Sequence, residues 1–271
     1  MPWMLLLITL AFAKEPPPGG WPDAPATATV TAVYDGDTLT LEGEAKERVR
    51  LRWVNTPELK PAEAYGAEAR DAARDFVLGR TVTLVVGETP RDGYGRIIAG
   101  VRTEQGDLSE LLLERGLAHL FVIPPDHTDI SKLVAAQKRA RDQELGIWST
   151  DRYQGALHIT SFHANAPGDD NENVNGEYIR VANIAAEPVD LAGWKLTDAS
   201  GHSFTLPTLS VPAGYTFVIH SGKGETQADP LRQLEVYLGS DTPVWNNSGD
   251  KATLFDPAGT VVDARAHEVK H

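Results

Sequence analysis

Hydrophobic and polar residues alternate in short runs through the first half of the chain, starting near Ala26. Alternation with a period of two is typical of strands that bury one face. Other stretches place apolar residues three and four positions apart, the pattern of amphipathic helices. The pattern predicts strands over 26–33, 38–42, 48–54, 81–88 and 95–103, and helices over 62–79, 109–117 and 130–146.

These elements favour one architecture. Five strands with helices inserted and appended are typical of a small closed barrel of the OB type. Ser109 stands at the start of the second predicted helix, and serine is a favoured N-cap residue, so we expect it to cap that helix. His119 follows this helix, and we expect it to be an exposed residue at the helix end.

The pattern changes after Trp148. Long helical periodicity ends, and turn signals recur at roughly ten-residue intervals between short apolar runs. This spacing predicts an all-β sandwich. The fold class is therefore α+β followed by all-β, with one domain over residues 27–150 and a second over residues 155–271. The short apolar runs that we expect to form the strands of the second domain lie at residues 178–183, 202–206, 216–220, 234–238, 252–255 and 261–267.

The N-terminus carries a short apolar run from Met4 to Phe12, which ends in the sequence AFA at residues 11–13. A small-x-small ending after an apolar run is the cleavage pattern of a signal peptide. We therefore expect residues 1–13 to be a signal peptide, residues 14–26 to be a flexible linker rich in proline and glycine, and the protein to be exported to the periplasm or the extracellular space. No Lys or Arg precedes the run, so a buried or anchoring segment is the alternative. A bilayer span takes about 20 residues, so we expect no transmembrane segment in the mature chain.

Charge limits how the chain meets a polyanion. The 271 residues have a net charge of −13. Residues 14–150 carry 17 Lys and Arg against 22 Asp and Glu, and residues 151–271 carry 8 against 16. This balance excludes a protein that coats nucleic acid through broad electrostatics, so any such contact needs local cationic clusters and metal ions. The chain has no cysteine, which excludes disulfides and thiolate metal sites.

A cluster of candidate site residues lies in the first domain. Asp35 and Asp37 flank Gly36 at a strand end, and closely spaced carboxylates on a bend suit Ca²⁺ or Mg²⁺. Such a triplet alone is more often an ordinary turn. Arg50 follows on the next strand and Glu58 comes directly after Pro57.

A second arginine, Arg96, is presented by the turn Asp92-Gly93-Tyr94-Gly95. Cations and guanidinium groups stabilise negative charge that develops on a phosphate, and a carboxylate can activate water. Two arginines and several carboxylates are therefore the groups that phosphodiester hydrolysis needs. The histidines show no HxH or HExxH spacing, so the sequence does not indicate a zinc site.

Residues 27–149 resemble the staphylococcal nuclease (thermonuclease) family. The matching segments stand in the family order and spacing: VYDGDTLTL, VRLRWVNTPE, RDGYGRIIAGV, LLLERGLAHL and QKRARDQELGIWS. The resemblance implies a calcium-dependent enzyme that cuts DNA or RNA. It implies in-line attack at phosphorus with loss of the 5′ oxygen, which leaves 3′-phosphate ends.

The resemblance also implies roles for single residues. Asp37 would ligate calcium with support from Asp35, and Thr56 would contribute its backbone carbonyl. Asn55 stands where the family usually has a second ligating aspartate. An amide oxygen can still ligate calcium, but one negative charge is lost, and affinity depends on the charge of the ligands.

Glu58 would be the general base, and Arg50 and Arg96 would bind the phosphate and stabilise the transition state. Family members place stacking tyrosines where this chain has residues 121–123, Phe-Val-Ile. Tyr94 remains as a ring that can contact substrate, or it packs in its turn. The alternative to an active enzyme is a catalytically weakened nuclease fold that acts as a nucleic-acid-binding or adhesion module.

Residues 156–268 resemble the lamin-tail domain. The segments that carry the resemblance are NGEY, VDLAGW, VPAG and VWNNSGD leading into ATL. The resemblance implies an immunoglobulin-like β-sandwich. It also implies a role in targeting or attachment, through a cell-envelope or protein partner.

Overall fold

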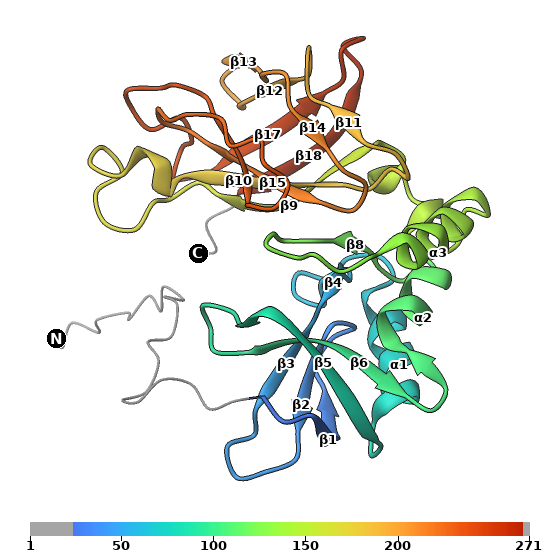
Figure 1. Cartoon of the computed structure of the whole chain (residues 1–271). Helices are drawn as coiled ribbons and strands as arrows, with labels where there is room; N and C mark the ends of the chain where they lie inside the picture. Colours follow the sequence, from blue (N-terminus) through green and yellow to red (C-terminus); the bar gives the residue numbers. More distant parts are fainter. Residues whose placement is uncertain (1–23, 268–271) are drawn as a thin grey trace, which may run out of the picture.

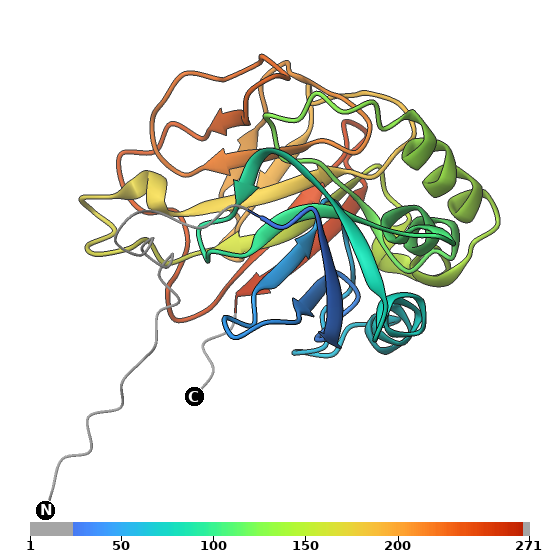
Figure 2. The ribbon, with the colours of Figure 1, turned by 60° about the horizontal axis from the view of Figure 1, so that its bottom comes forward.

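A computed structural model describes residues 24–267. The predicted signal peptide (1–13) and most of the predicted linker (14–26) lie outside these residues. The described chain forms a barrel with three α-helices on one side, and a β-sandwich that covers one end of the barrel (Figure 1). The view in Figure 2 shows the same helices on the same side of the barrel.

The barrel has the five strands that the alternating pattern predicts. They are β1 (Thr27–Val33), β2 (Thr38–Leu41), β3 (Arg48–Leu51), β5 (Thr81–Arg91) and β6 (Ile97–Thr103), and β7 (Gly106–Asp107) extends β6. The sheet order is β3-β2-β1-β5-β6-β7, and a parallel pairing of β3 with β6 closes it. The closed barrel is therefore confirmed. Alternate strand residues such as Val30, Leu39 and Val49 fill its interior and are fully buried.

The predicted strand over 48–54 is not continuous. It breaks after Leu51. The next strand, β4 (Trp53–Asn55), is not part of the barrel sheet and pairs with β8 (His119–Phe121), a strand that the sequence did not indicate. Trp53 has a φ of 70°, which is unfavourable for a bulky side chain. Asp126 holds the break, because its carboxylate accepts from Trp53 Nε1 at 2.8 Å and from Arg52 Nε at 2.9 Å.

The helices are α1 (Gly66–Val77), α2 (Leu108–Glu114) and α3 (Ser131–Asp142). The expectation that Ser109 caps the second helix is wrong: Asp107 is the N-cap residue and accepts from the backbone N–H of Ser109 and Glu110. A carboxylate in that position also interacts favourably with the helix dipole. Among residues 24–267, no helix is long and apolar enough to cross a membrane.

The second half of the chain forms two four-stranded sheets. One has the order β16-β15-β10-β9 and the other β13-β12-β17-β18. An apolar core that includes Trp194, Phe217 and Trp245 lies between them. The first sheet comprises β9 (Leu157–His163), β10 (Tyr178–Asn183), β15 (Thr216–His220) and β16 (Leu234–Tyr237). The second comprises β12 (Lys195–Thr197), β13 (Ser203–Thr205), β17 (Asp250–Phe255) and β18 (Val261–His267), while β11 (Val189–Asp190) pairs with β14 (Ser210–Val211).

Barrel and sandwich share buried polar contacts. The short 3-10 helices η1 (Gly146–Ser149) and η2 (Asp151–Tyr153) connect them, and a third, η3 (Val174–Gly176), precedes β10. Directly after β8, Val122 donates to Gly214 at 2.8 Å and accepts from the backbone of Thr216 at 2.9 Å. Gln137 on α3 accepts from Leu120 at 2.6 Å and donates to Ile184 at 2.9 Å. These contacts fix the sandwich against the β4–β8 pair.

Candidate active site

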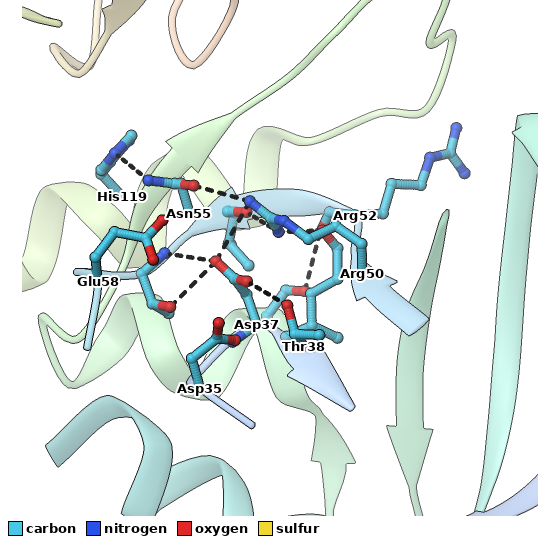
Figure 3. Close-up of polar contacts among 12 residues, drawn as sticks. Asp35, Asp37, Thr38, Arg50, Arg52, Asn55, Glu58 and His119 are labelled. Atoms are coloured by element: carbon cyan, nitrogen blue, oxygen red, sulfur yellow. Dashed lines mark hydrogen bonds and ion pairs between the residues drawn. The ribbon is translucent and has the colours of Figure 1, made fainter. Parts of the chain in front are cut away.

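The turn between β1 and β2 brings Asp35 and Asp37 together. A Cβ on Gly36 would lie 2.6 Å from Thr56 Cγ2 and 2.9 Å from Ala69 Cβ. Glycine is therefore required here by the close approach of Thr56 and α1. Asp35 accepts from the backbone N–H of Asp37 at 3.2 Å. The turn thus presents both side chains on the same side of the barrel (Figure 3).

Asp37 is the centre of the hydrogen-bond network. Its side chain is almost fully buried. Oδ2 accepts from the backbone N–H of Thr56 at 2.9 Å and from its hydroxyl at 3.1 Å, while Oδ1 accepts from the Thr38 hydroxyl at 3.2 Å. Such bonds hold a carboxylate in one orientation. Thr56 reaches Asp37 because the break at Trp53 turns β4 back toward the β1–β2 turn.

Arg50 is oriented by the same break. Its Nη1 donates to the carbonyls of Leu51 and Val54, both at 2.8 Å. Its Nη2 donates to Asn55 Oδ1 at 2.8 Å and lies 3.3 Å from Asp37 Oδ2. The guanidinium is thus fixed by backbone carbonyls on one side and faces the two candidate metal ligands on the other (Figure 3).

Asn55 is oriented from both ends of its carboxamide. Arg50 Nη2 donates a hydrogen bond, so the Asn55 oxygen must face Arg50. On the other side of the carboxamide, Nδ2 lies 3.5 Å from His119 Nε2. His119 Nδ1 is 2.8 Å from the carbonyl of Leu120, so that nitrogen carries the proton and Nε2 accepts. Burial, and then His158, lower the pKa of His119 to about 3. The expectation that His119 is exposed is wrong: it is fully buried on β8, and its contact with Nδ2 leaves the Asn55 oxygen facing Arg50.

Glu58 lies at the exposed rim of the site, beside Asn55 and Asp37 (Figure 3). Its backbone N–H donates to Glu63 Oε2 at 3.0 Å, and Glu63 is held by Arg152 at 2.6 Å. Burial of the carboxylate raises the pKa of Glu58, and the negative charges of Asp37 and Glu63 raise it further. A raised pKa makes a carboxylate a stronger base near neutral pH.

Arg96 and Tyr94 come from the turn between β5 and β6. Arg96 Nε donates to Asp92 Oδ2 at 2.7 Å, and its guanidinium lies 5.6 Å from the centre of the Tyr94 ring. Arg50 pairs with Ile98 in the parallel β3–β6 register. Arg96 precedes Ile98 by two residues, so its side chain leaves the same face of the barrel as Arg50. Among residues 24–267, no hydrogen bond or ion pair links Arg96 or Tyr94 to the Asp37 network, and Tyr94 is 52% exposed.

The oxygen atoms around Asp37 fit a hard divalent cation. Asp35 and Asp37 supply carboxylates, and the Asn55 amide oxygen shares with Asp37 Oδ2 a contact to Arg50 Nη2. Burial, and then the charge of Asp37, raise the pKa of Asp35 to about 6, although the positive charge of Arg50 partly opposes this rise. Oxygen ligands of this kind suit Ca²⁺. Within the described residues, no three His, Asp or Glu side chains come close enough to form a metal cluster by themselves, so amide, backbone and water oxygens would have to complete the shell.

Two family models match the chain: a staphylococcal nuclease homologue over residues 48–150 and a lamin tail domain over residues 150–268. The thermonuclease of Staphylococcus intermedius is 33% identical over 124 residues, which cover 44% of this chain and 74% of the relative. The chain belongs to the staphylococcal nuclease family. An uncharacterised endonuclease of Escherichia coli is 33% identical over 121 residues, covering 44% and 75%. Endonuclease YncB of Bacillus subtilis is 30% identical over 132 residues, covering 46% and 63%.

The barrel with its helices is therefore the staphylococcal nuclease domain, and the sandwich is the lamin-tail domain. The structure gathers six of the predicted residues at one site: Asp35, Asp37, Arg50, Asn55, Thr56 and Glu58. Sequence reasoning missed Glu63 and Asp126, and it placed His119 wrongly. Asp126 and His119 act on the site through partners more than sixty residues away, and the Arg152 that holds Glu63 is 89 residues away, so no local pattern marks these three.

The pKa of Asp35 predicts how pH changes the stability of the metal-free protein. An unfolded aspartate has a pKa of about 3.9, whereas Asp35 in the folded chain titrates at about 6. Between these values the folded chain keeps a proton that the unfolded chain has lost. Asp35 therefore stabilises the fold below about pH 4, and this contribution is lost as pH rises through about 6.

Urea unfolding in the presence of a chelator at pH 4 to 7 measures this effect. The free energy of unfolding of the wild type, relative to Asp35→Asn, is expected to fall over this range, because the amide cannot titrate. An identical pH dependence of the two proteins contradicts the prediction.

Proposed function

We propose that this chain is an exported, calcium-dependent nuclease that hydrolyses phosphodiester bonds of DNA or RNA and leaves 3′-phosphate ends. One observation carries the proposal: Glu58, with a raised pKa, stands at the rim of a network in which buried hydrogen bonds fix Asp37 and Arg50. Membership of the staphylococcal nuclease family supports the same chemistry.

In this proposal Glu58 accepts a proton from the attacking water. The water oxygen forms a bond to phosphorus as the bond to the 5′ oxygen breaks, and the leaving 5′ oxygen takes a proton from the solvent. Arg50 and Arg96 contact the non-bridging oxygens, where negative charge grows in the transition state. Carbonyls already orient Arg50, so little reorganisation accompanies the reaction.

Asp37, Asp35, the Asn55 amide oxygen and the Thr56 carbonyl are the residues that would hold calcium. The bound ion would supply positive charge beside the phosphate. Asn55 removes one negative charge from the ligand set, which weakens calcium binding. Millimolar calcium outside the cell would compensate, in keeping with an exported enzyme.

The test uses the purified chain without residues 1–13, a single-stranded DNA oligonucleotide and an RNA of matching sequence. With calcium, we expect cleavage to fragments whose mass shows a 3′-phosphate, and with a calcium chelator we expect none. Binding of either nucleic acid without cleavage at any calcium concentration overturns the proposal in favour of a nucleic-acid-binding or adhesion module.

Export and the role of the lamin-tail domain belong to the same proposal. The AFA ending at residues 11–13 supports cleavage before Lys14. N-terminal sequencing of protein from the periplasm or the medium tests this, and a chain retained in the cytoplasm with Met1 contradicts it. We infer that the lamin-tail domain attaches or targets the enzyme through a cell-envelope or protein partner.

A further inference from the structure

The lamin-tail domain lies against the side of the nuclease domain that carries the candidate site. A buried chain of contacts runs from Asn55 to β18. Asn55 Nδ2 faces His119 at 3.5 Å, the rings of His119 and His158 are 5.2 Å apart, and His158 Nδ1 lies 2.9 Å from Asp263 Oδ2. These two rings and the Asp263 carboxylate are almost fully buried. The contacts bring β18, an edge strand of the sandwich, next to the metal-ligand side of the site.

Arg265 follows Asp263 by two residues on β18, so both side chains leave the same face of the strand. Both contact Ile159 on β9: its N–H donates to Asp263 at 2.6 Å, and its carbonyl accepts from Arg265 Nη1 at 3.3 Å. Strands β9 and β18 are the edges of their two sheets. Arg265 is therefore held at the margin of the lamin-tail domain that adjoins the nuclease domain.

Within the described part of the chain, the guanidinium of Arg265 has no carboxylate partner and donates to the Ile159 carbonyl. Glu63 does not serve as its partner, because Arg152 and the Glu58 backbone N–H already bind that carboxylate. Arg265 is half-buried, and a guanidinium removed from part of its water gains most from an anionic ligand.

Contacts through η2 place β18 beside the rim where Glu58 stands. The ring of His158, which contacts Asp263, lies 4.5 Å from the ring of Tyr153 on η2. The preceding residue, Arg152, binds Glu63 at 2.6 Å, and Glu63 accepts from the backbone N–H of Glu58 at 3.0 Å. Arg265, two residues after Asp263, therefore lies near this rim.

We propose that Arg265 forms a second phosphate-binding subsite, supplied by the lamin-tail domain, for a nucleic-acid phosphate next to the one that is cut. This inference rests on the proposed function. A planar guanidinium fork suits a phosphate, which it can bind through two N–H donors. In a protein with a net charge of −13, such local cations must supply the electrostatic attraction for the substrate.

The experiment compares the wild type with Arg265→Ala and Arg265→Lys on two substrates: a single-stranded oligonucleotide and a dinucleotide that has one phosphodiester. For the oligonucleotide, Arg265→Ala should lower kcat/KM about tenfold through KM, and the plot of log kcat/KM against log salt should become shallower by about 0.7. The dinucleotide has no neighbouring phosphate, so its kcat/KM should not change. Arg265→Lys keeps the charge and should retain most of the salt slope.

Arg232→Ala is the matched control, because Arg232 is an exposed arginine of the lamin-tail domain before β16 and its removal changes the net charge equally. It should leave both substrates unaffected. Equal losses on dinucleotide and oligonucleotide, or an unchanged salt slope in Arg265→Ala, overturn the subsite.

Oligonucleotide binding in chelator, followed by fluorescence anisotropy, separates this inference from the proposed function. If the wild type binds but does not cut, the nuclease proposal fails, and a shallower salt slope of binding in Arg265→Ala still supports the subsite. If the wild type cuts and Arg265→Ala behaves identically in cleavage and in binding, the subsite alone fails.

Discussion

Replacement of Glu58 by glutamine is expected to lower kcat for oligonucleotide cleavage by about 10²- to 10⁴-fold, the range that a general base contributes. Glutamine has nearly the same shape but cannot accept the proton of the attacking water. Glu58 lies at the exposed rim and its backbone N–H bonds Glu63, so the substitution leaves the supporting contact in place. Initial rates at saturating calcium and substrate measure the effect.

Glu68→Gln provides the matched control, since Glu68 is an exposed residue of α1. It should cleave at the wild-type rate. Calcium affinity by titration calorimetry and the thermal unfolding midpoint should be retained in Glu58→Gln. A kcat within threefold of the wild type would remove Glu58 from the role of base.

Replacement of Asp37 by asparagine is expected to weaken calcium binding by about 100-fold, because the central carboxylate of the ligand set loses its charge. Asp37 is almost fully buried and accepts hydrogen bonds from Thr38 and Thr56. An amide in its place retains only part of this network. Calorimetric titration with calcium gives the dissociation constant directly, without reference to activity.

Asn55→Asp supplies the opposite change on the same oxygen cluster, since it adds one carboxylate. It should lower the calcium dissociation constant, with part of the gain lost because a carboxylate oxygen then faces the unprotonated Nε2 of His119. A calcium affinity that decreases from Asn55→Asp to the wild type to Asp37→Asn supports the ligand set. An Asp37→Asn variant that binds calcium as tightly as the wild type would exclude Asp37.

The periodicity of the sequence predicts the barrel well. Alternating residues such as Val30, Leu39 and Val49 bury one face of their strand whichever strand pairs with it. The local pattern is therefore sufficient to predict these strands. Asp35 and Asp37 lie two residues apart in one turn, so their proximity follows from the local sequence, whereas the resemblance to the nuclease family was needed to group Glu58 with them.

The break at Trp53 is beyond such reasoning. Residues 48–54 alternate as one strand, yet the left-handed φ of Trp53 is stabilised by Asp126, more than seventy residues later. The break turns Asn55 and Thr56 toward Asp37. A feature that shapes the ligand set is thus determined by a distant carboxylate that no local pattern connects with it.

His119 and Val122 show the same limit. His119 is expected at the exposed end of a predicted helix and no strand is predicted around Val122, yet contacts with His158 and Thr216 of the lamin-tail domain help to bury both. The burial of these residues depends on a domain whose docking cannot be deduced from periodicity. Prediction of the two folds was therefore possible, while prediction of their shared surface was not.

The side chain of Gln137 is one of the links between the two domains. It accepts from Leu120 beside the nuclease site and donates to Ile184 in the lamin-tail domain, and it is only 2% exposed. During gene rearrangement, a nuclease domain that acquired a different companion would carry an unsatisfied amide into the new junction. A cut between the two domains at residue 150 would therefore leave the Gln137 amide N–H in the nuclease domain and its acceptor, the Ile184 carbonyl, in the lamin-tail domain.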